Sequence, residues 1–271
     1  MPMRKTSIGF ILAPLLYVWP LAAQDRELVT LPTRDGVTQS YLLEAPSHPP
    51  HAAAVLFPGG GGNIRLRQED GQIRFSSNNF LVRSRHEFVR RGIMVAVMDA
   101  PSDRRSGMND DFRSDSRHRD DVRAVVADLD RRFPATAVFL IGTSRGTVSA
   151  AYLGRALGSA VAGVVLSASV FLPSGKRTLY GGHGLAGFDF SSIKPPLLLV
   201  HHQDDGCSVT PYHAAQRLAG RFPLVSVSGG KPAVSSPCEA LSEHGFLGRE
   251  AETVEAIVNW MLKRPYASEI N

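Results

Sequence analysis

Short apolar runs alternate with helical periodicities along most of the chain. The near-continuous apolar runs are residues 52–57, 93–98, 137–141, 161–167, 196–200 and 224–227. Runs of this kind are typical of strands that are buried on both faces of a sheet. The pattern therefore predicts an α/β fold, with a mostly parallel central sheet and helices on both of its faces.

The segments between these runs carry the signals of helices and turns. An antiparallel hairpin is expected first, because strand-like residues 27–31 and 37–45 flank Asp35-Gly36. Helices are expected over residues 80–91, in the segment that ends at Pro134, after Gly146, from Thr210-Pro211 to about residue 221, and over residues 254–262. The stretch 167–195 is too short for a lid domain, so only a minimal cap is expected.

Composition narrows the class of protein. The 271 residues are 43% hydrophobic and 20% charged, which suits one α/β domain with a large core. The formal net charge is +5, but no basic stripe with interleaved aromatic residues is present, so we expect no nucleic-acid partner. Two cysteines are too few for a disulfide framework or a cysteine-rich zinc site. His201 and His202 are adjacent and would point to opposite sides of a strand, so we expect no metal site there, and we expect no cofactor.

The N-terminus has the pattern of a secretory signal peptide. Arg4 and Lys5 precede an apolar run over residues 8–19, which small residues follow up to Ala23. The run is shorter than the roughly 20 residues of a membrane-spanning helix. We therefore expect a signal peptide over residues 1–23, a single domain over residues 24–271, and a periplasmic or extracellular protein without stable membrane insertion.

The sharpest chemical signal is Ser144, in the sequence Gly142-Thr143-Ser144-Arg145-Gly146 at a predicted strand-to-helix junction. Glycines on both sides allow the tight turn that raises a nucleophilic hydroxyl above a sheet. The helix that follows directs its first N–H groups at the same space. Ser144 is therefore the candidate nucleophile.

A serine hydroxyl needs a base, and the base needs a carboxylate that orients it. His244 lies beyond the last predicted strand and is the candidate base. The carboxylate is either Asp204 or Asp205, at the end of the run 196–200; Asp205 is favoured because it lies closer to the loop that must return towards His244.

Four glycines, Gly59 to Gly62, follow the run 52–57. Glycine lets backbone N–H groups approach a developing oxyanion with no Cβ in the way. We expect the N–H of Gly60 or Gly61, together with that of Arg145, to form an oxyanion hole.

With these residues the chain resembles an α/β-hydrolase over about residues 27–264. The resemblance rests on the order Ser144, Asp205, His244, on the Gly142–Gly146 turn and on the Pro58–Gly62 loop. Within the superfamily the chain is similar to compact, exported bacterial serine hydrolases of unassigned substrate. The loop begins with Pro58 where the lipase-type motif has histidine, which argues against a lipase.

Cys207 follows the candidate acid and Cys238 precedes the candidate base. In an exported protein such a pair is expected to form a disulfide, which would tie the two loops together.

Charged side chains crowd residues 103–123. We expect them to belong mainly to a solvated helix start, and we expect one of Arg104, Arg105 and Arg113 to reach an acidic group of a substrate. Arg145 is expected to pair with a carboxylate of the same segment.

The sequence thus predicts a carboxylesterase-type serine hydrolase that acts on a small-molecule acyl substrate through an acyl-enzyme. The alternatives are a peptidase or amidase with the same residues, and a non-catalytic binding protein on a hydrolase scaffold. Neither the acyl group nor the oligomeric state follows from the sequence.

Overall fold

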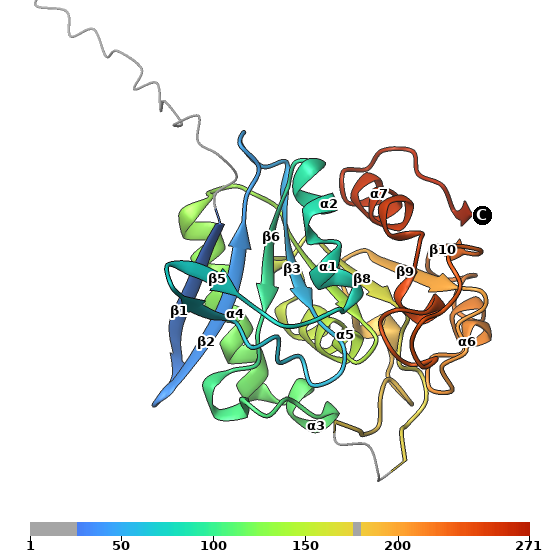
Figure 1. The fold of residues 1–271 in the computed structure, drawn as a ribbon, viewed down its shortest axis with the longest axis horizontal. Coiled ribbons are helices and arrows are strands. Elements are labelled where there is room, and N and C mark those ends of the chain that lie inside the picture. Colours follow the sequence, from blue (N-terminus) through green and yellow to red (C-terminus); the bar gives the residue numbers. More distant parts are fainter. Residues whose placement is uncertain (1–25, 176–179) are drawn as a thin grey trace, which may run out of the picture.

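A computed structural model describes residues 26–175 and 180–271 (Figure 1). The expected signal peptide lies outside these residues. Within them, the central sheet has nine strands in the order β1-β2-β6-β3-β7-β8-β9-β10-β11. The strands of this sheet are β1 Arg26–Arg34, β2 Val37–Glu44, β3 Ala52–Phe57, β6 Ile93–Met98, β7 Val138–Thr143, β8 Gly163–Ser167, β9 Leu197–His202, β10 Leu224–Val227 and β11 Glu269–Ile270.

The direction of the strands confirms the expected hairpin and the mostly parallel sheet. Strand β2 pairs antiparallel with β1 and with β6, and the pairs from β6 to β11 are parallel. The hairpin therefore forms one edge of the sheet. A small antiparallel hairpin of β4 (Arg67–Glu69) and β5 (Gln72–Arg74) stands apart from it, and the sequence did not predict it.

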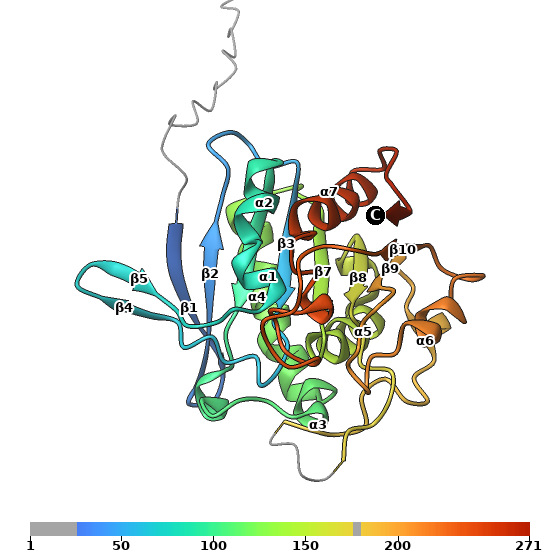
Figure 2. The same ribbon diagram turned by 45° about the vertical axis from the view of Figure 1, so that its right-hand side comes forward.

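Helices cover both faces of the sheet (Figures 1 and 2). Those of the described residues are α1 Phe80–Arg83, α2 Arg85–Arg90, α3 Asp110–Arg113, α4 Ser116–Arg132, α5 Gly146–Leu157, α6 Tyr212–Gln216 and α7 Glu250–Met261. Strand β3 shows why a continuous apolar run was needed. Ala53, Val55 and Phe57 pack in the core layer of α4 and α5, whereas the alternate residues face the layer of α1, α2 and α7.

Two expected helices differ from the structure. The helix over residues 80–91 is divided at Ser84, which ends α1 and precedes α2. The helix at Thr210-Pro211 is only the short α6, and the chain after Gln216 continues in turns, such as the bond from the N–H of Arg221 to the carbonyl of Leu218. The hydroxyl of Thr210 does not cap this helix, because it bonds to Asp205.

The described residues of the segment that connects β8 to β9 form a loop. Its described residues contain a single 3₁₀ turn at Phe190–Ser192 and no longer helix, in agreement with the expected minimal cap. None of the helices in residues 26–175 and 180–271 is long and apolar enough to cross a membrane.

Candidate active site

Ser144 occupies the turn between β7 and α5. It directly follows the strand, and its φ of 52° lies in the left-handed region that side chains other than glycine rarely adopt. Its N–H donates to the carbonyl of Ser167 on β8. Strain of this kind is retained where the surrounding structure imposes it, which is common at functional sites. The structure therefore contains the sharp turn that the sequence predicted at Ser144.

Both glycines around Ser144 are required by close packing of the backbone. A Cβ on Gly146 would lie 1.9 Å from the carbonyl oxygen of Phe57, and a Cβ on Gly142 would lie 2.3 Å from that of Gly146. The first turn of α5 is thereby held against the end of β3. This contact brings the loop of residues 58–62, called the glycine loop below, next to Ser144: a Cβ on Gly59 would lie 2.8 Å from the Cβ of Ser144.

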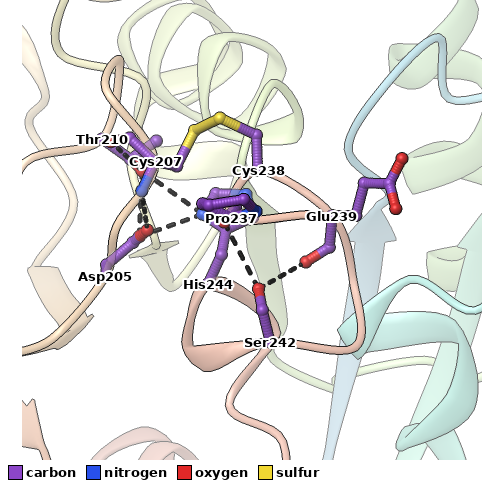
Figure 3. Close-up of a disulfide and its surroundings, with 8 residues drawn as sticks. All are labelled: Asp205, Cys207, Thr210, Pro237, Cys238, Glu239, Ser242 and His244. Atoms are coloured by element: carbon purple, nitrogen blue, oxygen red, sulfur yellow. Dashed lines mark hydrogen bonds and ion pairs between the residues drawn. A yellow bond between two sulfur atoms is a disulfide. The ribbon is translucent and has the colours of Figure 1, made fainter. Parts of the chain in front are cut away.

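His244 and Asp205 form a buried pair on loops that lie far apart in the sequence. Nδ1 of His244 is 2.9 Å from Oδ2 of Asp205. The same oxygen accepts a 2.9 Å hydrogen bond from the hydroxyl of Thr210, and Oδ1 accepts one from the N–H of Cys207. The carboxylate is thus held from several sides and orients the imidazole ring (Figure 3).

The alternative acid, Asp204, is not part of this pair. The side chain of Asp204 is 71% exposed, whereas that of Asp205 is completely buried. Burial of Asp205 opposes its ionisation, but the hydrogen bond with His244 and the charge of that ring outweigh burial and lower its pKa below the ordinary value. Asp205, and not Asp204, is therefore the carboxylate that is bonded to His244.

A disulfide joins the two loops that carry this pair, as expected from the sequence. Cys207 and Cys238 are bonded, with their Cα atoms 4.5 Å apart (Figure 3). Cys207 is also the residue whose N–H binds Asp205. The covalent bond consequently ties the Asp205 loop to the loop that leads into His244.

Ser144 and His244 line one cavity of about 260 Å³, together with Gly59, Gly60 and Asn79. The Nε2 atom of His244 is buried and has no hydrogen-bond partner among the described residues. A buried nitrogen without a partner is uncommon and calls for an explanation. Since Nδ1 is engaged by Asp205, Nε2 is the nitrogen that remains for a proton transfer inside the cavity.

The two candidate oxyanion residues of the glycine loop have different surroundings. Gly60 lines the cavity of Ser144, whereas Gly61 faces the ring of Tyr180, 2.8 Å from where its Cβ would be. Arg145 is the N-cap residue of α5, so its N–H lies at the positive end of that helix. The arrangement favours Gly60 and Arg145 as donors.

Two arginines have the roles of buried anchors. The side chain of Arg145 forms the expected ion pair with the charged segment 103–123: its Nη1 lies 2.7 Å from the carboxylate of Asp110. The expectation that Arg113 reaches a substrate is wrong, because Arg113 is buried and bonds to the carbonyls of Pro58 and Gly60. Arg104 and Arg105 line two other surface cavities.

Thr210 is a site residue that the sequence did not predict. Its hydroxyl lies 2.9 Å from Asp205 and 3.3 Å from Nδ1 of His244. The available signal, a threonine before proline, is shared with ordinary helix starts. No group of three or more histidine, cysteine, aspartate or glutamate residues in the described ranges has the arrangement of a metal site.

The family model of serine aminopeptidase S33 matches residues 77–227, more than half of the chain. The chain belongs to this family. The matched range of this S33 member contains Ser144 and Asp205 and ends before His244. No curated protein matches the chain by sequence.

Solved structures show the same fold at low sequence identity. An α/β serine hydrolase without lid from Xanthomonas campestris is 16% identical, with a TM-score of 0.56 over 87% of this chain and 96% of that one. Est1E from Butyrivibrio proteoclasticus is 12% identical, with a TM-score of 0.58 over 87% and 98%. An α/β serine hydrolase homologue from Coxiella burnetii is 13% identical, with a TM-score of 0.54 over 88% and 96%. The S33 member thus has the α/β-hydrolase fold.

Proposed function

We propose that this serine hydrolase cleaves a carboxylic ester or a similar acyl bond through Ser144, His244 and Asp205. The observation that carries the proposal is the buried Asp205–His244 pair, whose free Nε2 lines the same cavity as the hydroxyl-bearing turn of Ser144. Such a constellation is recognised by its geometry and by the roles of its members.

The reaction follows the ordinary course of acyl transfer. Nε2 of His244 takes the proton of Ser144 as its oxygen attacks the carbonyl carbon, and Asp205 stabilises the resulting imidazolium. The N–H groups of Gly60 and Arg145 stabilise the oxyanion, and His244 then passes the proton to the leaving group. Water hydrolyses the acyl-enzyme by the same steps, and neither a metal nor a cofactor takes part.

The test compares wild type with Ser144→Ala. Wild type is expected to react covalently with a fluorophosphonate probe and to turn over p-nitrophenyl acyl esters, and both signals are expected to disappear in the variant. Loss of about 10⁴-fold or more in kcat is expected when the nucleophile is removed. A folded wild type that shows neither signal would support the non-catalytic binding protein instead.

A peptidase or aminoacyl amidase is the second candidate, because the matched family is described as serine aminopeptidase. The exposed carboxylate of Glu239, which has no ion-pair partner among the described residues, lines the same cavity and suits a protonated amino group. Faster turnover of aminoacyl p-nitroanilides than of acyl esters would favour this candidate. Loss of that preference in Glu239→Gln would assign the recognition to this carboxylate.

We also propose that the protein is exported to the periplasm or the medium. The basic and apolar pattern of residues 1–23 supports export, and so does the Cys207–Cys238 disulfide, since such bonds persist in oxidising compartments. Fractionation of expressing cells, with the mass of the mature protein, tests the proposal. A cytosolic protein that retains residues 1–23 would contradict it.

A further inference from the structure

A charged side chain is buried beneath the glycine loop. Arg113, the last residue of α3, is among the largest fully buried side chains. Its Nη2 atom donates to the carbonyl oxygens of Pro58 at 3.2 Å and of Gly60 at 3.0 Å, and Nη1 donates to the hydroxyl of Ser149 on α5 at 2.8 Å. The guanidinium therefore connects the loop after β3 with the helix that follows Ser144.

The environment of this guanidinium is unusual for a buried charge. Buried charges are normally paired with an opposite charge, yet none of the described carboxylates accepts a hydrogen bond from Arg113. The neighbouring Asp110 is bonded to Arg145 and to the N–H of Gly184. Burial lowers the pKa of Arg113 to about 10, so the side chain stays protonated at neutral pH. A positive charge is thus kept in contact with neutral oxygens, mainly those of the loop.

The contacts of Arg113 determine which way the peptide groups of the loop face. In a trans peptide the C=O and the following N–H point in opposite directions. Holding the carbonyls of Pro58 and Gly60 towards Arg113 therefore fixes the two peptide groups on either side of the Gly59–Gly60 peptide, which carries the candidate donor, the N–H of Gly60.

Two further carbonyls of the loop are also engaged. That of Gly59 accepts from the N–H of Gly62, and that of Gly61 accepts from the N–H of Met108. By contrast, the N–H groups of residues 59–61 donate to no residue in the described part of the chain. The loop is thus anchored through its carbonyls, and its donors are left available.

The loop also makes room for the guanidinium. A Cβ on Gly62 would lie 2.7 Å from Nη2 of Arg113, and Gly62 has a φ of 70°. The last glycine of the run is therefore needed beside Arg113, whereas Gly60 lines the cavity of Ser144. The glycine that packs against Arg113 and the glycine whose N–H is the candidate donor therefore occupy different positions of one short loop.

We propose that Arg113 is a positioning residue for the oxyanion hole: its guanidinium holds the carbonyls of Pro58 and Gly60 back, and by fixing the peptide groups on both sides of the Gly59–Gly60 peptide it keeps the N–H of Gly60 available to the oxygen of an acyl group at Ser144. The inference rests on the proposed hydrolase function, which it deepens. Arg113 does not touch the substrate; it acts through the backbone of the loop.

The test compares Arg113→Met and Arg113→Lys with wild type, on a p-nitrophenyl ester that wild type hydrolyses. In Arg113→Met we expect kcat to fall by about 10- to 100-fold, part of the 10²–10³ that loss of one oxyanion donor costs, with KM changed less than about three-fold. Inhibition by an alkyl boronic acid, whose tetrahedral adduct places an oxygen in the hole, is expected to weaken by the same factor. Arg113→Lys keeps the charge and one hydrogen bond. Its kcat and its boronic acid affinity are expected to lie between those of wild type and those of Arg113→Met.

The matched control is Arg132→Met, which removes a guanidinium that pairs with Glu27 and Asp128 at the far end of α4. It is expected to lower the Tm and to leave kcat within about two-fold. If the Arg113 variants behave like this control, with a lower Tm but unchanged kcat and boronate affinity, the inference is overturned. If Arg113→Met does not fold, the same comparison with Arg113→Lys decides.

A wild type that hydrolyses no acyl substrate would refute the proposed function. The positioning itself would then be decided by amide hydrogen exchange at residues 59–61 in wild type and Arg113→Lys. Faster exchange or altered amide shifts in the variant would support a loop held by Arg113, and identical exchange would overturn it.

Discussion

The loops on the two sides of Ser144 are held in place by different means. On the side of the base, the loops of Asp205 and His244 are tied by a hydrogen bond between the two side chains and by the Cys207–Cys238 disulfide. On the side of the oxyanion, the glycine loop is held without a covalent bond, by the buried guanidinium of Arg113 and by backbone hydrogen bonds.

The difference follows from what each side has to present. The base side presents side chains, whose positions a crosslink between their loops restricts directly. The oxyanion side presents backbone N–H groups, and a side-chain crosslink would not determine which way a peptide group faces. Hydrogen bonds to the carbonyls do so, because each carbonyl orients the N–H that follows it.

The largest expected effect lies on the base side, where adjacent carboxylates have unequal roles. Asp205→Asn is expected to lower kcat by about 10⁴-fold, because an amide leaves the imidazole in the wrong tautomer and does not stabilise its charge. Asp204→Asn, which changes an exposed neighbour, is expected to stay within about two-fold of wild type. Steady-state kinetics of both variants measures the difference, and equal losses would contradict the assignment of Asp205.

The sequence predicted the two sides unequally, for a physical reason. Ser144 and His244 follow predicted strands, and the carboxyl ends of parallel strands meet at one edge, so their neighbourhood followed from the pattern alone. The choice between Asp204 and Asp205 stayed open, because it depends on the direction in which the chain turns after β9. Arg113 has no signal that separates it from Arg104 or Arg105 in the same charged run, since only the packing of α3 against the glycine loop buries it.

The disulfide gives the second effect, again on the base side. Replacing both cysteines, Cys207→Ser with Cys238→Ser, is expected to lower the free energy of unfolding by about 3–4 kcal/mol, from the entropy of a loop of this length. Urea unfolding of wild type and variant measures it. Reductant is expected to lower the stability of wild type and to leave the double variant unchanged, and an equal response of both would contradict a structural disulfide.

Gly62 offers the corresponding measurement on the oxyanion side. Gly62→Ala adds a Cβ beside both Arg113 and Met108 at a positive φ, whereas Gly36→Ala adds one at a similar φ of 64° with nothing within 4 Å. The backbone cost of about 1–2 kcal/mol is therefore common to both variants. Unfolding free energies are expected to fall by about 2–3 kcal/mol in Gly62→Ala and by about 1 kcal/mol in Gly36→Ala. Equal losses would mean that the side chains of Arg113 and Met108 move away from the loop freely.

The smallest effect concerns the buried histidine on each side. Burial lowers the pKa of His118, which bonds the same Ser149 hydroxyl as Arg113, to about 3, and that of His201, near Asp205, to about 4. Below the unfolded pKa of about 6.5 the unfolded chain takes up protons that these rings do not, so stability is complete above this pH and falls as the pH drops towards the folded values. Each ring contributes a slope of about 1.4 kcal/mol per pH unit.

His118→Asn tests the contribution of the oxyanion side alone. The free energy of unfolding, measured in urea, is expected to fall between pH 6 and pH 5 by about 1 kcal/mol less in this variant than in wild type. The part of the fall that is due to His201 remains. The comparison uses the change with pH within each variant, so a general loss of packing at position 118 does not affect it. An unchanged pH dependence would show that His118 takes up its proton in the folded protein, and the buried contact between its ring and Ser149 would then have to open in mild acid.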